Sequence, residues 1–414
     1  MTIKAVILVG GPSRGTRFRP LSLDVPKPLF PIAGHPILYH HLVALSKVQQ
    51  VKEVFLIGFF EAAVFTNFLS QVRPEFPGLA IKYLREYQPM GTAGGLYHFR
   101  DELRKGNPEG IFVLHADVCC NPPFSEIMEF HKSRKALCTI VGTKVPKDQA
   151  KNYGCLVASP SSSEVLHYVE KPESFISDLI SCGMYFFEEA IFDEIKKAKE
   201  ALVSSSRYQE VSQDHAQENL QLEQDLLQPL AGSSKIFVFE TKQPWRQLNT
   251  ASSALLANGL YLNEFAKSSP ERISQKGPGS PEFVGNVYIH PTAHIHPSVK
   301  LGPNVSIGPN VNIEEGVRVR ESIILDDVHI KANACVIQSI IGWNSLIGCW
   351  CRIEGTPSSP QDGAGATITK NGIKIQSTTI FGKEVTVRDE CVIRNCLVLP
   401  NKELKEDFHN EILM

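Results

Sequence analysis

Two glycines and several basic residues near the start of the chain have the composition of a phosphate-binding loop. Gly10 and Gly11 directly follow the apolar run 5–9, which indicates a buried strand. Glycine lets backbone N–H groups approach a phosphate closely, and Arg17 and Lys27 add positive charge to the same stretch. The stretch lacks the Gly-Lys-Ser/Thr of a Walker loop and the spacing of a Gly-x-Gly-x-x-Gly fingerprint. It therefore predicts a nucleotide-phosphate site of another kind.

The elements that must position this loop follow from an alternation of apolar runs and helical patterns over the first part of the chain. Besides the run before Gly10, such runs stand at 54–58, 111–114 and 235–239. This alternation predicts an α/β domain with a mainly parallel central sheet. Ligands of such sheets bind at the carboxyl ends of the strands, which is where Gly10 lies. The stretch 203–221 is polar and patternless, and we interpret it as a surface excursion.

A six-residue repeat of aliphatic residues occupies the C-terminal part of the chain. It runs unbroken from Ile289 to Leu325, and it resumes at Ile341 and again at Val387 after phase slips. An aliphatic residue at every sixth position, with Gly and Asn between, predicts one short strand on each side of a three-sided coil. The sequence therefore predicts a parallel β-helix.

The two patterns define the domain organisation. We predict a first domain over 1–265, a linker over 266–284, which is rich in Ser, Pro and Gly, and a coil over 285–414. Residues 355–376 break the six-residue repeat, and a coil accommodates such an insertion as a loop that leaves its surface. Two interpretations of the loop stay open. It is either a neutral excursion, since long loops cost little, or an arm that contacts a partner.

Composition excludes several functional classes. The 414 residues include 42 basic and 44 acidic side chains without a basic block, which argues against a nucleic-acid partner. The ten cysteines lack the spacing of a zinc site and fit reduced thiols. No signal peptide and no apolar stretch of about 18 residues is present, so we expect a cytoplasmic protein without a membrane partner.

Residues 10–28 resemble the signature of the sugar-1-phosphate nucleotidyltransferases, which runs Gly-Gly-x-Gly-Thr-Arg-Leu-Arg-Pro and later Pro-Lys-Pro. The matching residues are Gly10, Gly11, Gly15, Thr16, Arg17, Arg19, Pro20, Pro26, Lys27 and Pro28. The coil is similar to the left-handed hexapeptide family. Together these resemblances imply a Rossmann-like nucleotidyltransferase domain followed by a left-handed parallel β-helix, with Arg17 and Lys27 neutralising phosphate oxygens.

The resemblance also assigns positions for the nucleobase and for a metal ion. In the family, the segment that here follows Glu86 and contains Gly91 holds the nucleobase. A carboxylate accepts two hydrogen bonds and guanine offers two adjacent donors, so Glu86 leads to the hypothesis of a guanine preference. Asp117 follows the apolar run 111–114 and matches the family's first Mg²⁺ ligand. A turn or helix cap is the simpler alternative for Asp117.

The sugar end of the site is assigned in the same way. Gly154, Glu170 and Lys171 match the family's contacts to the sugar and its phosphate. Ser181 stands where the family usually has Asn, which weakens one expected contact to the sugar. Because the other three contacts match, we expect most of the sugar pocket to be retained.

Two departures from the family pattern predict weak catalysis. Pro12, Ser13 and Arg14 stand where the family has a single residue, and Pro12 removes an N–H donor from the phosphate loop. Gln247 replaces the Asp that supplies the second metal ligand in active relatives. Because Mg²⁺ relies on one or two carboxylates together with substrate phosphates, a neutral amide leaves any Mg²⁺ binding weak.

The combination of altered loop, Gln247, coil and outward loop resembles the regulatory branch of the mannose-1-phosphate guanylyltransferase family. The resemblance implies that the chain binds GDP-mannose and associates with a catalytic, beta-type subunit. It also implies that the chain mediates feedback inhibition of that subunit by the product, and that the coil supports self-association.

Three alternatives stay open at this point. The first is an active guanylyltransferase that joins mannose 1-phosphate to GTP and releases pyrophosphate. The second is a non-enzymatic scaffold subunit, as in translation-factor exchange complexes with the same two-domain layout. The third is acyl transfer by the coil, for which the candidate residues are His290, His294, His296 and His329. Turn positions explain these histidines more simply.

Overall fold

The computed structural model describes residues 2–11, 16–206, 219–357, 367–370 and 373–414. The chain divides into two compact units, of which the first comprises Met1–Arg14 and Leu38–Trp245 and the second comprises Gly15–Ile37 and Arg246–Met414. Pro12, Ser13 and Arg14 lie outside the described residues, so the predicted effect of this insertion stays a prediction. None of the described helices is both long enough and apolar enough to span a membrane.

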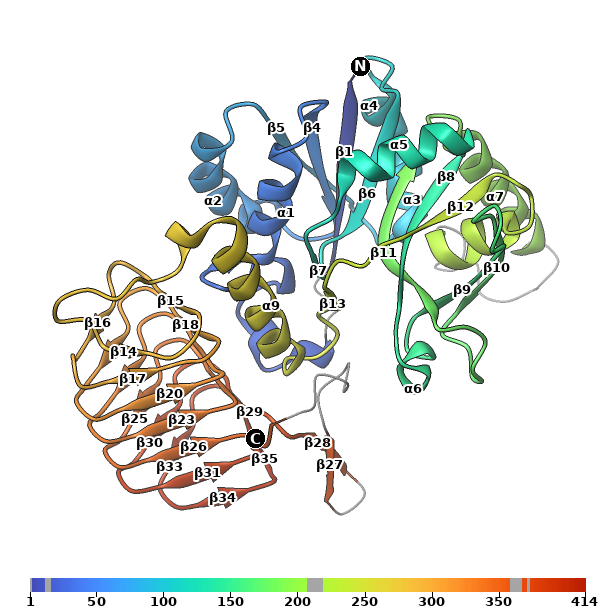
Figure 1. The fold of residues 1–414 in the computed structure, drawn as a ribbon. Helices are drawn as coiled ribbons and strands as arrows, with labels where there is room; N and C mark the ends of the chain where they lie inside the picture. The colour runs from blue at the N-terminus through green and yellow to red at the C-terminus, as the bar shows by residue number, and fades with distance from the viewer. Residues whose placement is uncertain (1, 12–15, 207–218, 358–366, 371–372) are drawn as a thin grey trace. The chain divides into compact units, whose positions relative to one another are not determined.

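The first unit is an α/β layer built on a mixed sheet in the order β10-β9-β11-β6-β1-β4-β5, with β8 beside β11 and β12 beside β8 (Figure 1). Its strands are β1 (Ile3–Gly10), β4 (Val51–Gly58), β5 (Ala80–Arg85), β6 (Gly110–His115), β8 (Cys138–Lys144), β9 (Gly154–Ala158), β10 (Val165–Glu170), β11 (Leu179–Phe187) and β12 (Ile236–Glu240). Strands β6, β1, β4 and β5 are parallel, whereas β11 runs antiparallel to β6, β8 and β9. The four predicted apolar runs form β1, β4, β6 and β12.

Helices cover both faces of this sheet, which explains why its central strands are apolar over most of their length. Val6 and Val113 belong to the core that α3 and α7 complete, while Phe112 packs edge-on against Phe124 of α5, 4.7 Å between ring centroids. The helical segments are α1 (Ile37–Ser46), α2 (Ala62–Val72), α3 (Thr92–His98), α4 (Arg100–Arg104), α5 (Phe124–Arg134), α6 (Lys147–Ala150), α7 (Ile191–Ser206), the π-helical turn Leu222–Leu227, α8 (Gln228–Leu230) and α9 (Ser253–Ser268).

The second unit contains the predicted coil. Its strands in the described residues form three parallel sheets, and in Figure 1 they stack as short rungs coloured from orange to red. The first sheet holds β14 (Glu282–Phe283), β17 (Lys300–Leu301), β20 (Arg318–Arg320), β23 (Cys335–Ile337), β26 (Arg352–Glu354), β31 (Val392–Arg394) and β34 (Phe408–His409). The second sheet holds β15 (Val287–Ile289), β18 (Val305–Ile307), β21 (Ile323–Ile324), β24 (Ser339–Ile341), β29 (Thr379–Phe381), β32 (Leu397–Val398) and β35 (Ile412–Leu413). The third sheet holds β16 (His294–Ile295), β19 (Asn312–Ile313), β22 (His329–Ile330), β25 (Leu346–Ile347), β30 (Thr386–Val387) and β33 (Glu403–Leu404). The predicted fold class, a Rossmann-like domain followed by a left-handed β-helix, is confirmed.

The register of the coil explains the phase slips in the repeat. Lys300 pairs with Arg318, one turn of three six-residue units further on, and Arg318 then pairs with Cys335 after a turn that is one residue shorter. Arg352 pairs with Val392, so the insertion lies within a single turn and the ladder closes across it. The described part of the insertion is an antiparallel pair, β27 (Thr367–Lys370) and β28 (Ile373–Gln376).

Besides its core, the coil has buried aliphatic side chains that point away from that core. Ile323, Ile340 and Ile380 alternate with the residues of the coil core, yet at most 2% of each is exposed. Helix α9 packs on this sheet at β18, and the buried Asn258 of α9 accepts a hydrogen bond from Ala33 N at 2.8 Å. Residues 15–37 and α9, which we assigned to the first domain, therefore belong to the same unit as the coil.

We expect acid to destabilise the first unit through His131 of α5. Only 4% of His131 is exposed, and burial, together with the charge of Lys132, lowers its pKa to about 4. Because an unfolded histidine titrates near 6.5, the unfolded state binds more protons between these two values, and stability falls as the pH is lowered through this window. The loss from this residue is about 2 kcal/mol between pH 7.5 and pH 5.

Urea denaturation of the wild type and of His131→Asn at these two pH values measures this effect. The variant is expected to lose less stability on acidification than the wild type. Some pH dependence remains in the variant, because burial also lowers the pKa of His41 to about 4. Equal losses of stability in the two proteins would contradict the assignment to His131.

Candidate functional site

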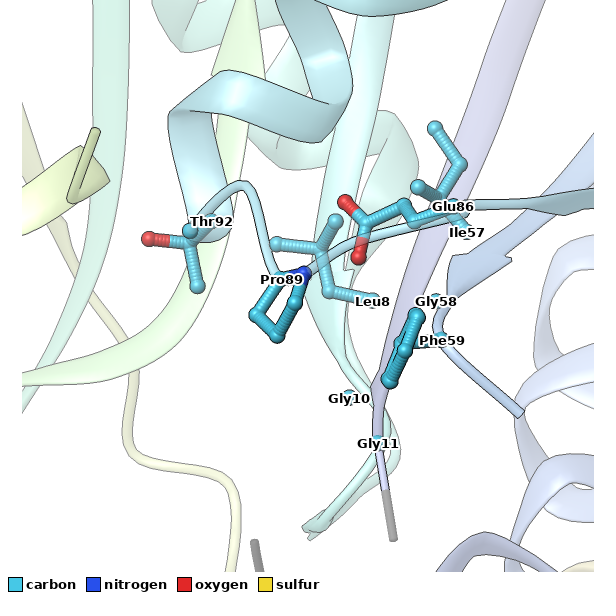
Figure 2. Close-up of a pocket in the computed structure, with 10 residues that line it drawn as sticks. Leu8, Gly10, Gly11, Ile57, Gly58, Phe59, Glu86, Pro89 and Thr92 are labelled. Carbon is cyan, nitrogen blue, oxygen red and sulfur yellow. The ribbon is translucent and has the colours of Figure 1, made fainter. Parts of the chain in front are cut away.

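A pocket in the first unit brings together the residues predicted to hold the phosphate and the nucleobase. It lies at the carboxyl ends of β1 and β4, as expected for a parallel sheet. The residues that line it are Leu8, Gly10, Gly11, Ile57, Gly58, Phe59, Glu86, Pro89, Gly91 and Thr92 (Figure 2). Two motifs that are distant in the sequence, one with Gly10 and Gly11 and the other with Glu86 and Gly91, thus line one pocket.

The glycines in this pocket allow main chains to come close together. Gly10 has φ +73°, and its carbonyl oxygen accepts a hydrogen bond from Phe59 N at 2.8 Å. A Cβ atom on Gly58 would lie only 2.4 Å from that same oxygen. Among the described residues, and apart from its two chain neighbours, no atom lies within 4 Å of a Cβ built on Gly10, so the end of β1 presents open backbone to the pocket.

Glu86 supplies the carboxylate of the pocket. Its side chain is buried, with 8% of the residue exposed, and its main-chain N–H donates to Gly58 O at 2.8 Å. A Cβ atom on Gly95 would lie 2.1 Å from Glu86 Oε1, so the carboxylate packs directly on the backbone of α3. Figure 2 shows the carboxylate projecting beside Leu8 and Pro89. This arrangement offers a fixed acceptor to a ligand with paired N–H donors.

The segment after residue 218 holds residues 86–94, the stretch predicted to bind the nucleobase and called the nucleobase loop below, and the sequence did not indicate this contact. Leu220 N donates to Met90 O at 2.9 Å, and Leu220 O accepts from Ala93 N at 3.0 Å. Leu220 is 2% exposed, so it does not belong to a surface excursion as we had interpreted 203–221. The available signal was the group of leucines at 220, 222, 226 and 227, of which Leu222 and Leu226 have the i, i+4 spacing of a buried helical face.

Asp117 lies in the turn between β6 and β7 (Val118–Cys120), next to the buried His41 of α1. Among the described residues, no group of three or more His, Cys, Asp or Glu side chains is arranged to hold a metal ion. Asp117 stays a predicted Mg²⁺ ligand, and an ion held there would take further ligands from substrate phosphates.

The predicted sugar contacts also lie together. Gly154 and Glu170 are paired across β9 and β10, and Tyr168 donates a hydrogen bond to Glu170 Oε2 at 3.1 Å. A Cβ atom on Gly154 would lie 2.1 Å from the Tyr168 hydroxyl, so only glycine permits this contact. Lys171 forms an ion pair with Glu170 at 3.1 Å and remains largely exposed.

Three predicted residues belong to the second unit. Arg17 is exposed in the 3₁₀ turn Thr16–Phe18. Lys27 Nζ donates to Leu248 O at 3.2 Å, which places this lysine beside the stretch that contains Gln247. Asn249 Nδ2 donates to Gln247 Oε1 at 3.2 Å. The glutamine therefore acts as a hydrogen-bonding amide and adds no negative charge.

Comparison with known proteins decides the family. Residues 4–245 match the family model described as nucleotidyl transferase, and residues 283–413 match the GMPPB C-terminal domain. A Schizosaccharomyces pombe protein named "Probable mannose-1-phosphate guanyltransferase" is 50% identical over 100% of both chains. The chain belongs to the mannose-1-phosphate guanylyltransferase family.

Other members of the mannose-1-phosphate guanylyltransferase family carry a more specific name. The Dictyostelium discoideum and Homo sapiens proteins named "Mannose-1-phosphate guanylyltransferase regulatory subunit alpha" are 49% and 46% identical, over 100% of this chain and 99% and 100% of theirs. A Bacillus anthracis crystal structure titled "Putative Glucose-1-Phosphate Thymidylyltransferase" shares the fold, with TM-score 0.50 and 20% identity over 63% of this chain and 95% of that one.

Two of the coil histidines, His290 and His296, form hydrogen bonds within turns. His290 Nδ1 accepts from Thr292 N at 3.3 Å and lies 2.9 Å from the Thr292 hydroxyl. His296 repeats this turn with Ser298, six positions later. The repeated geometry favours the interpretation of these histidines as turn residues.

Proposed function

We propose that the chain is a regulatory subunit of mannose-1-phosphate guanylyltransferase that binds GDP-mannose and inhibits a catalytic, beta-type partner when this product is abundant. The observation that carries the proposal is Gln247, a neutral amide at the position where active relatives place the second metal-binding Asp. The names of the Dictyostelium and human relatives support a regulatory role and a catalytic partner.

The retained pocket supports binding of the product. Glu86 offers acceptors for guanine, the glycines at the end of β1 offer open backbone to phosphates, and Gly154 and Glu170 lie where sugar contacts are expected. With Asp117 as a single carboxylate, Mg²⁺ would bind weakly and mainly through ligand phosphates. A site that recognises the nucleotide sugar but holds the metal poorly binds the product without forming it efficiently.

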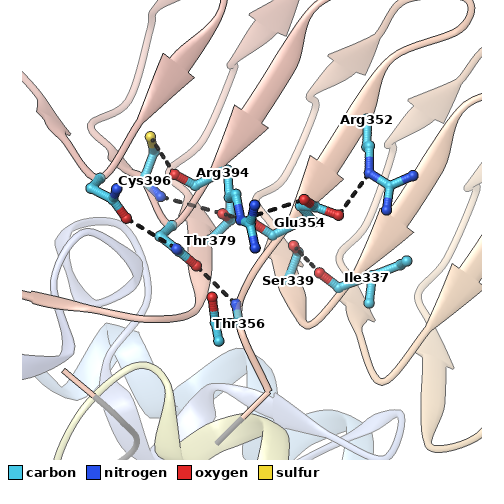
Figure 3. Close-up of polar contacts among 10 residues, drawn as sticks. Ile337, Ser339, Arg352, Glu354, Thr356, Thr379, Arg394 and Cys396 are labelled. Atoms are coloured by element: carbon cyan, nitrogen blue, oxygen red, sulfur yellow. Dashed lines mark hydrogen bonds and ion pairs between the residues drawn. The ribbon is translucent and has the colours of Figure 1, made fainter. Parts of the chain in front are cut away.

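The 355–376 loop is our candidate for the element that reports occupancy to the partner. Its root is attached to the coil, since the Thr379 hydroxyl donates to Glu354 O at 2.6 Å and Thr356 N donates to Asn395 Oδ1 at 2.8 Å (Figure 3). At the other end of the loop, Gln376 Oε1 accepts a hydrogen bond from Ser252 N at 3.0 Å. Ser252 lies five residues after Gln247, so the loop contacts the segment that carries the altered metal position.

Deletion of 355–376 tests this proposal. We expect the shortened chain to assemble with the catalytic subunit, because the coil pairs Arg352 with Val392 across the insertion, and to lose inhibition by GDP-mannose. Assembly is measured by size-exclusion chromatography and inhibition by pyrophosphate release from the complex. Gln376→Ala, which keeps the loop but removes its contact with Ser252, is expected to weaken inhibition partially. Full inhibition in the deletion variant would rule out the loop.

An active guanylyltransferase is the second candidate, and the retention of Asp117 and Lys27 favours it. In that case Lys27 and Arg17 would neutralise the phosphates of GTP while a phosphate oxygen of mannose 1-phosphate attacks the α-phosphorus of GTP and pyrophosphate leaves.

A further inference from the structure

A largely buried carboxylate outside the predicted site lies at the centre of a hydrogen-bonded chain in the first unit. The side chain of Glu223, in the π-helical turn after Gln221, is 15% exposed. Its Oε1 lies 3.2 Å from His115 Nε2 and accepts a hydrogen bond from the Tyr185 hydroxyl at 3.2 Å. Its Oε2 accepts from the Thr92 hydroxyl at 3.3 Å. One carboxylate thus joins β6, β11 and α3.

The Thr92 branch leads to the nucleobase end of the pocket. Thr92 lines the pocket and begins α3, and its hydroxyl accepts a hydrogen bond from Leu222 N at 2.8 Å while donating to Glu223. The loop just before it needs such support, because Gly91 has φ +79° and a Cβ there would lie 2.3 Å from Leu220 O. Glu223 and its neighbours therefore fix the conformation of the nucleobase loop.

The Tyr185 branch leads to the sugar end. The Ser181 hydroxyl lies 3.5 Å from Tyr185 Oη and accepts from Gly183 N at 3.3 Å. Ser181 occupies the position where a sugar-contacting Asn is usual in the family. Burial raises the pKa of Tyr185 well above its ordinary value, so the phenol keeps its proton and donates to Glu223. The hydrogen bonds run from Ser181 through Tyr185 to the carboxylate.

The charge of Glu223 strengthens both branches. Burial alone would raise the pKa of its carboxyl, but the hydrogen bonds from His115, from Tyr185 and from its own backbone together lower it. Hydrogen bonds to an ionised acceptor are roughly twice as strong as neutral ones. A carboxylate that holds two neutral hydroxyl donors therefore resists independent movement of the elements that carry them.

We propose that Glu223 is a positioning residue that couples the nucleobase end of the nucleotide-sugar pocket to its sugar end. The inference rests on the proposed binding of GDP-mannose. Its consequence is that a change at the sugar end alters affinity for GDP, a ligand without the sugar, and that this effect passes through Glu223.

A double-mutant cycle with GDP as the probe tests the coupling. Titration calorimetry gives the affinity of the wild-type chain, Glu223→Gln, Tyr185→Phe and the double variant. We expect Glu223→Gln to weaken GDP binding about tenfold, and Tyr185→Phe to weaken it about fivefold in the wild-type background. In the Glu223→Gln background, Tyr185→Phe should weaken GDP binding by less than about twofold. Glu164→Gln is the matched control, since Glu164 also accepts two hydrogen bonds, both from Ser234, and lies outside the pocket.

The outcomes separate this inference from the proposed function. Additive effects in the double variant, or unchanged GDP affinity in Tyr185→Phe, would overturn the coupling while leaving the proposed function in place. A wild-type chain that binds neither GDP nor GDP-mannose would overturn both. If circular dichroism shows that Glu223→Gln is unfolded, two variants of Thr92 replace it in the test. Thr92→Ser keeps the donating hydroxyl and should retain the GDP affinity of the wild type, whereas Thr92→Val should lower that affinity about tenfold. Equal affinities of these two variants would overturn the inference.

Discussion

Supplied with GTP, mannose 1-phosphate and Mg²⁺, the purified chain is expected to release pyrophosphate at least ~10²-fold more slowly than typical enzyme rates of about 1–10³ s⁻¹. Gln247→Asp is expected to raise the residual rate. The reason is electrostatic, because the substitution would restore the carboxylate that the family has at this position, whereas Gln247 offers a neutral amide whose oxygen accepts from Asn249. Recovery should be partial if the Pro12–Arg14 insertion also misplaces the triphosphate.

A coupled pyrophosphate assay measures both rates. Gln243→Asp is the matched control, since it adds a carboxylate at an exposed position four residues earlier and should leave the rate unchanged. Wild-type turnover in the ordinary enzyme range, with little change in Gln247→Asp, would contradict the proposed regulatory function and would favour the alternative that the chain is an active guanylyltransferase. No turnover from a folded chain that binds GDP-mannose would support a sensor whose output lies in its partner.

Glu86→Gln is expected to weaken GDP binding about 10²-fold and to affect UDP binding much less. Glutamine keeps the shape of the side chain but replaces one acceptor oxygen with an N–H₂ donor, which then faces the donors of guanine. Gly95→Ala should act in the same direction, because its Cβ would lie 2.1 Å from Glu86 Oε1 and must displace the carboxylate.

Fluorescence or calorimetric titrations with GDP and UDP measure this selectivity. Glu109→Gln serves as a control, because it removes a carboxylate that forms an exposed ion pair with Lys132. The wild-type chain should bind GDP-mannose more tightly than UDP-sugars. Equal binding of the two nucleotide sugars, or an equal loss for GDP and UDP in Glu86→Gln, would show that another group reads the base.

The insertion loop and the contacts of Glu223 have one property in common: each uses hydrogen bonds to join segments that lie far apart in the sequence. Ser252 bonds to Gln376 across the loop, and Thr92 and Tyr185 meet on Glu223. Both contacts tie ligand-binding segments to elements that contribute no ligand contact of their own in our proposals. Product binding can therefore favour one arrangement of these elements, as linkage between sites requires.

Much of the fold could be read from local patterns. The strand before Gly10 and the six-residue repeat each depend on the period of apolar residues, and a period is a local property of the chain. Gly10 and Gly11 were accessible for a related reason, since glycines directly after a strand already indicate a phosphate loop, whereas Glu86 and Gly91 were assigned through the resemblance to the family. The direction of β11, antiparallel to β6, was not accessible, because a buried strand has the same apolar pattern in either direction.

The sequence by itself determined that this is an α/β domain followed by a β-helix and that the Asp expected at one metal position is Gln247. Tertiary structure alone decided that residues 15–37 and α9 belong with the coil, because contacts such as those of Asn258 with Ala33 N and with Asn304 O join segments that no local pattern connects. It alone also placed Glu223 between Thr92 and Tyr185. A buried carboxylate is stable only beside donors that satisfy it, and those donors come from segments about 40 and 130 residues away in the chain, a distance over which spacing carries no information.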